Sequence, residues 1–166
     1  QKLVIDTSMR MADINMLNNS SQFPVNIRFD SRISNPVDWK RYEVFMRPDV
    51  WYNAFDGVKA GLSVNGNYMR QFHVFDLAAW MNTGLAQMNI DKRDLLFHDM
   101  VAFRFNYSTS TNGFSPNSWI RLGAKSLDGL QAGYIGFEKK DPSEKNTFAI
   151  RIQSLQRKSN ADLIYL

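Results

Sequence analysis

Apolar and polar residues alternate along most of the chain after residue 57. Residues 58–65 are the clearest case, and the same period of two recurs in residues 101–108, 119–125 and 148–153. It is less regular in residues 72–81 and 131–139. Such alternation is typical of strands with one covered and one wet face. In residues 58–65 the first face would carry Val58, Ala60, Leu62 and Val64, and the second Lys59, Gly61, Ser63 and Asn65.

Short turn sequences separate these runs. Gly66-Asn67 lies in the first gap and Asn112-Gly113 in a later one. Asp128-Gly129 lies between the fourth and fifth runs, and Asp141-Pro142 before the last. These residue types favour tight turns. Parallel strands need a crossover of about a dozen residues, so these gaps allow only hairpins. We therefore predict a mainly β fold, an antiparallel up-and-down meander of about six strands in an open or partial-barrel-like sheet. Residues 84–100 could form a helix or a long hairpin loop.

Residues 1–50 lack this regular alternation and are predicted to form an irregular leader. They contain a short predicted strand, Leu3-Val4-Ile5, and prolines at positions 24, 36 and 48. We divide the chain into 1–50, a leader closing an upstream domain, and 51–166, the meander or partial barrel. We expect the chain to be a processed or excised piece, because it starts at Gln1 without an initiating methionine or a signal peptide and stops on an apolar run at Leu166. We expect further strands after Leu166, because natural sheets cover or close their edges.

The apolar face of such a meander has two uses. It could cover a soluble core, or it could meet lipid as part of an outer-membrane-type barrel. Lys59, Arg104, Arg121 and Arg151 on the second face suit a wet interior and open solvent equally. No apolar run approaches the roughly 20 residues of a spanning helix.

Composition restricts the chemistry further. The formal charge of +4 comes from 20 Lys and Arg without a dense basic run, so we expect no nucleic-acid partner. Zero cysteines exclude disulfides and thiolate sites. The two histidines, His73 and His98, do not form the H-E-x-x-H pair that a zinc peptidase requires. We predict no catalytic residue and no metal site in this chain.

Aromatic residues are the remaining candidates for ligand binding. Exposed tryptophans can stack on sugar rings, or form an interfacial girdle in a barrel. The candidate ligand-binding residues are Trp51, Tyr52, Trp80 and Trp119, and the alternative function is a small-ligand or glycan-binding β-domain.

Two stretches resemble a known family. Residues 4–15, with Asp6, Arg10, Asp13 and Asn15 in an apolar-Asp-x-x-x-Arg-x-x-Asp-apolar-Asn pattern, look like the strand segment that follows the catalytic region in bacterial gluzincin metallopeptidases of the aminopeptidase N family. Residues 47–61 are similar to the start of the β-rich C-terminal extension in Bacteroidota members, and to the opening strand of bacterial surface-antigen barrels. The likeness continues at residues 128–131 and 145–148.

The resemblance implies a role beside an enzyme. The chain would be a non-catalytic structural or envelope-associating C-terminal region of an exported zinc-dependent metallopeptidase, in the periplasm or outer membrane. Zinc would be held by the missing catalytic domain and not by this chain. The expected partners are that upstream domain, the membrane, and a second copy of the chain through open sheet edges.

Overall fold

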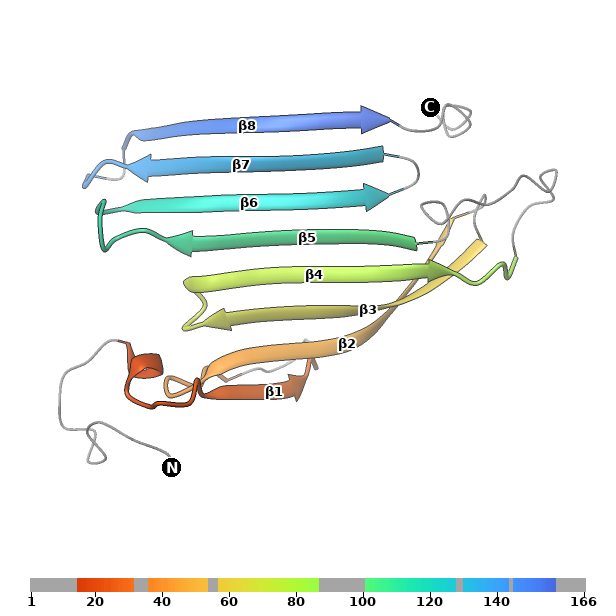
Figure 1. Ribbon diagram of the computed structural model, residues 1–166, viewed down its shortest axis with the longest axis horizontal. Helices are drawn as coiled ribbons and strands as arrows, with labels where there is room; N and C mark the ends of the chain where they lie inside the picture. Colours follow the sequence, from red (N-terminus) through yellow and green to blue (C-terminus); the bar gives the residue numbers. More distant parts are fainter. Residues whose placement is uncertain are drawn as a thin grey trace.

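Eight strands form one sheet in which every strand pairs with the next strand along the chain (Figure 1). The computed structural model describes residues 15–31, 36–53, 57–86, 101–127, 130–143 and 145–157. All neighbouring pairs are antiparallel except β1 with β2. The elements are a 3-10 helix η1 (Met16–Asn18) and the strands β1 (Val25–Phe29), β2 (Tyr42–Asn53), β3 (Gly57–Tyr68), β4 (Phe72–Asn82), β5 (Val101–Ser110), β6 (Ser118–Leu127), β7 (Leu130–Lys140) and β8 (Thr147–Arg157).

The predicted fold class is confirmed, and the predicted number of strands was wrong. Two strands that the sequence did not indicate, β1 and most of β2, lie within the range assigned to an irregular leader. Pro48 obscured β2, because proline cannot donate to a ladder. It follows Met46, the last β2 residue that pairs with β1, so it lies where β2 forms the sheet edge and proline is tolerated. The short run at residues 3–5 lies outside the described residues, as does nearly all of the segment 84–100.

The turn between β3 and β4 also differs from the prediction. Gly66 and Asn67 lie within β3, and the chain reverses at Met69 and Arg70, which have φ of 53° and 59°. The Gln71 N–H donates to the Tyr68 carbonyl at 3.1 Å, and two positive φ values are typical of a type I′ hairpin turn. Neither residue is a usual choice there, so propensity alone could not locate this turn.

Of the other three predicted turns, the structure describes two. Residues 112–114 and 142–143 form turns as expected, whereas Asp128-Gly129 lies outside the described residues.

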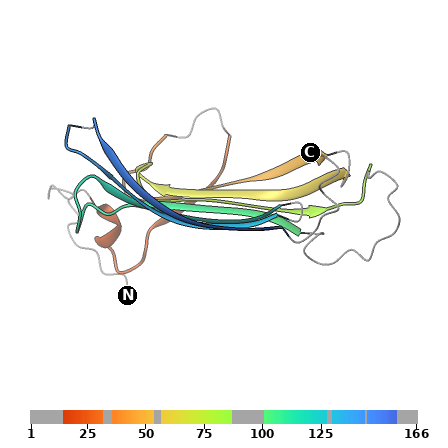
Figure 2. The same cartoon turned by 90° about the horizontal axis from the view of Figure 1, so that it is seen from above.

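The described strands make a single curved layer (Figure 2). At one end of the sheet, η1 packs through Leu17 against Tyr42 and Tyr68. The Met16 N–H donates to the Tyr68 hydroxyl at 2.9 Å, and that hydroxyl donates to the Trp39 carbonyl at 3.0 Å. This cluster covers only the end of the sheet, so most of both faces carries no second layer among the described elements.

The pairing registers sort all eight strands into two continuous faces. One register row crosses the whole sheet without a charged or strongly polar side chain: Ile27, Val44, Gly66, Phe75, Tyr107, Leu122, Ile135 and Ile152. The neighbouring row, on the opposite face, is polar over most of its length: Arg28, Phe45, Asn65, Asp76, Asn106, Gly123, Tyr134 and Gln153. The alternation predicted for residues 58–65 therefore extends through the sheet.

Candidate functional site

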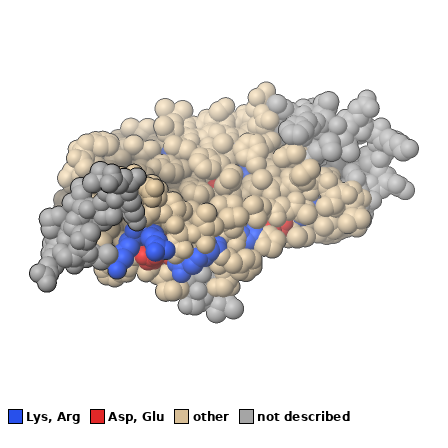
Figure 3. Space-filling model, turned by 60° about the horizontal axis from the view of Figure 1, so that its bottom comes forward, with Lys and Arg blue, Asp and Glu red and all other residues tan. Residues whose placement is uncertain are grey.

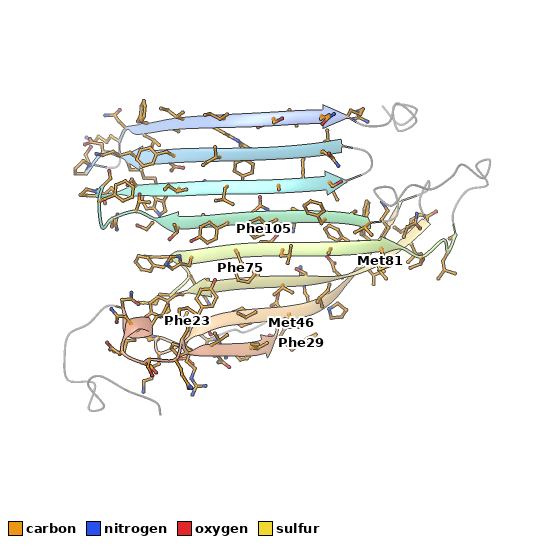
Figure 4. The ribbon with its side chains drawn as sticks, in the orientation of Figure 1. Phe23, Phe29, Met46, Phe75, Met81 and Phe105 are labelled. Carbon is orange, nitrogen blue, oxygen red and sulfur yellow. The ribbon has the colours of Figure 1, made fainter. Side chains whose placement is uncertain are left out.

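The described part of the chain has an exposed apolar face, the one that carries the apolar register row. It is exposed and not packed: Leu62 is 44% exposed, Ile135 54% and Ile152 70%. Figure 4 labels Phe29, Met46, Phe75, Phe105 and Met81, which spread this face over β1, β2, β4 and β5. Figure 3 shows a broad uncharged surface, with charged atoms gathered mainly toward its lower edge. Contiguous exposed apolar surface of this kind marks an interaction site.

The opposite, polar face is covered by its own side chains. Ala78 and Ser63 are almost completely buried, and Lys59 is only 3% exposed. Phe45, Trp80 and Ala102 on this face are buried as well, so both polar and apolar side chains pack here, while large apolar side chains of the opposite face stay exposed. The crowding indicates that the polar face is the inner side of the curve.

Ion pairs between strands organise the polar face. Arg104 donates through Nε and Nη2 to Asp76 Oδ1 at 3.1 and 2.9 Å. Arg121 Nη2 lies 3.0 Å from Glu138 Oε2, and Arg47 Nη1 lies 3.7 Å from Asp30 Oδ2. A further pair joins Arg28 to Glu43, whose carboxylate is buried. A buried carboxylate requires such a partner, which Arg28 provides for Glu43. The carboxylates of the other three pairs are more exposed, and those pairs contribute less.

Tyr134 fills a gap left by a glycine on the same face. It is the cross-strand partner of Gly123, and a Cβ at that position would lie 2.8 Å from Tyr134 Cζ. The Tyr134 hydroxyl donates to Asn106 Oδ1 at 3.1 Å, and the Arg151 guanidinium stacks 4.0 Å from the Tyr134 ring centre. The Tyr134 ring therefore contacts residues of β5, β6 and β8.

The predicted ligand-binding aromatics do not form one platform. Trp51 and Trp80 meet edge to face at 6.3 Å, with the Lys59 ammonium 5.0 Å from the Trp51 ring, but Trp80 is only 8% exposed. Tyr52 follows Trp51 on β2 and so points to the apolar face, where it is 58% exposed. Trp119 is the second residue of β6, and its ring centre lies 5.5 Å from the Lys140 ammonium. The structure thus joins two of the four residues and separates the others.

The titratable groups near η1 form hydrogen bonds within the sheet. Burial, with a smaller contribution from Tyr107, raises the pKa of Tyr42 to about 12. The Tyr42 hydroxyl donates to the His73 carbonyl at 2.5 Å, and His73 Nδ1 lies 2.7 Å from the Tyr107 hydroxyl. His73, near the start of β4, is therefore linked to β2 and β5, and His98 lies outside the described residues.

The described residues offer neither a metal-binding cluster nor a membrane-spanning helix. They contain no group of three His, Asp or Glu side chains that could hold a metal ion. Within the same ranges, no helix has the length and apolarity needed to cross a membrane.

Fold and surfaces together define a single-sheet, mostly antiparallel β protein with one apolar and one polar face. Compared with family models, with curated proteins and with solved structures, the chain matches none. These comparisons do not bear on the resemblance to gluzincin metallopeptidases, which stays a prediction.

Proposed function

We propose that this chain is a non-catalytic, membrane-associating sheet whose apolar face lies against lipid and whose polar face lies toward water. The observation that carries the proposal is the exposed apolar face, which continues over all eight strands. Burying apolar surface contributes roughly 25 cal/mol for each Å² removed from water. Lipid acyl chains can cover a broad face of this kind without requiring a matching protein surface.

The strand lengths support the same proposal. Strands β2 to β8 contain 10 to 12 residues each. A tilted strand needs about 9–11 residues to cross the hydrocarbon layer of a bilayer, and strands in soluble proteins most often have about 5–6. In this arrangement the ion pairs of the polar face stay in contact with water and are not transferred into lipid.

The edges of the sheet require partners in this setting. All eleven residues of β8 are exposed, and no described strand pairs with its outer side. Unpaired backbone groups are costly in lipid, so the proposal includes further strands from the same protein, or a second copy of the chain, beside β8.

A flotation experiment tests the proposal. The chain is refolded from urea with vesicles of phosphatidylcholine, a neutral lipid that the net positive charge cannot attract, and is then centrifuged in a sucrose gradient. The apolar face predicts co-flotation that survives high salt and alkaline washing. A detergent-free, monodisperse monomer that stays at the bottom of the gradient would refute membrane association.

The link to a peptidase rests on the resemblance of residues 4–15 and 47–61 to gluzincin enzymes. In that context the sheet would position an upstream catalytic domain at the cell envelope of the exporting bacterium, and zinc would belong to that domain. The chain incubated with Zn²⁺ and aminoacyl or peptide substrates is expected to give no turnover. Metal-dependent hydrolysis by the chain alone would contradict the non-catalytic role.

A further inference from the structure

A hollow of about 330 Å³ opens on the polar face between β5 and β8. Its charged lining residues are Arg104, Lys125 and Arg151, and none of its lining residues is acidic. A volume of this size is at the lower end of small-ligand sites. The charge of the lining selects an anion.

The positive charges that line the hollow lie close together, and carboxylates neutralise them only in part. Arg104 lies directly opposite Lys125 in the pairing of β5 with β6, and like charges in that position destabilise a sheet. Asp76 engages Arg104 through Oδ1 alone, which leaves three of the five guanidinium N–H donors for another acceptor. Lys125 and Arg151 form no ion pair with a carboxylate in the described part of the chain. A bound anion would offset this repulsion.

The geometry also fixes the orientation of one cation. Arg151 stacks on Tyr134, whose hydroxyl is anchored on Asn106. A stacked guanidinium keeps its N–H groups in the plane of the fork, which suits the two oxygens of a carboxylate or phosphate. The side-chain amides of Asn106 and Gln153 also line the hollow and can donate further hydrogen bonds.

We propose that this hollow is a binding site for a small oxyanion, a phosphate or carboxylate group held by Arg104, Lys125 and Arg151. The site is formed by the polar face alone, so it does not depend on what covers the apolar face. Its ligand would reach it from the aqueous side.

Isothermal titration calorimetry of the full chain in a non-ionic detergent tests the site, with inorganic phosphate in one arm and malonate in the other. Saturable one-to-one binding is expected, weakening as NaCl is added. Arg151→Gln and Lys125→Gln are each expected to weaken binding about tenfold, the effect of losing one charge-assisted hydrogen bond. Arg151→Lys should fall between wild type and Arg151→Gln, because it keeps the charge and loses the fork.

Arg121→Gln is the matched control. Arg121 shares β6 and the polar face with Lys125, but it pairs with Glu138 and does not line the hollow. The affinity of Arg121→Gln for either anion should be within about twofold of wild type. Far-ultraviolet circular dichroism shows whether each variant keeps the sheet. Absence of saturable binding in both arms overturns the proposal. An equal loss in Arg121→Gln overturns it as well, because binding would then follow total charge. Preference for one arm identifies the oxyanion class.

Discussion

Ile152→Arg is expected to weaken insertion of the chain into phosphatidylcholine bilayers by about 2–4 kcal/mol, the cost of an arginine near the midplane on a lipid-facing strand surface. Ile152 lies at the centre of β8, in register with Ile135, and is 70% exposed. In water an exposed edge position of this kind tolerates arginine with little change. The measurement is the free energy of folding into vesicles, obtained from urea titrations.

Gln153→Arg supplies the control for this experiment. Gln153 is the next residue on β8, is also exposed, and lies on the polar face opposite Tyr134. The same substitution there should change the free energy by no more than about 0.5 kcal/mol, as at ordinary surface positions. If the two arginines have equal effects, the two faces of β8 meet the same environment and the lipid-facing assignment fails.

Gly61→Ala should destabilise the sheet by about 1–3 kcal/mol, which is the usual cost of overpacking a tight site. A Cβ at this position would overlap the Ala79 carbonyl oxygen and lie 2.6 Å from Trp80 Cδ1. Because one of these neighbours is backbone, relief requires movement of β4 and not only a change of rotamer. The free energy of unfolding in urea, measured in detergent, detects the loss.

Gly133→Ala is the comparison variant. Its added Cβ would lie 3.8 Å from the nearest atom, the Gly123 carbonyl oxygen, which is an ordinary van der Waals contact. Its stability is expected to equal that of wild type or to exceed it slightly, because alanine loses less conformational freedom on folding. Equal destabilisation by both variants would mean that backbone freedom matters at these positions and contact does not.

The sequence predicted the class of the fold because a period of two requires no knowledge of strand pairing. The faces of residues 58–65 follow directly from it. The parallel pair β1 and β2 was missed because Val25–Phe29 is short and Pro48 interrupts the pattern of β2. The turn at Met69 and Arg70 was missed because tertiary pairing of β3 with β4 imposes positive φ on residues that seldom adopt it.

The candidate sites depended on register, which local sequence does not encode. Nothing near Arg104 indicates that it faces Lys125 on the next strand or bonds Asp76 on the previous one. A shift of one residue would move every such side chain to the other face. The tryptophans were chosen as candidates because they are large aromatic residues. Trp51 and Trp80 meet because they lie opposite nearby positions of β3, the strand between β2 and β4.

The sequential strand order has a consequence for the folding pathway. From β2 onward each strand pairs with its chain neighbour, so the sheet can grow by adding one hairpin at a time. Loop-closure entropy rises only slowly with loop length, and local pairing of this kind favours fast folding. The segment of residues 83–100 joins β4 to β5 and separates two groups of strands, β2–β4 and β5–β8, that can form independently before they dock. Strand β1 pairs in parallel with β2 across residues 30–41, a shorter connection than residues 83–100. Joining β4 to β5 is therefore the more costly loop closure, and the docking of these two groups is the natural last step.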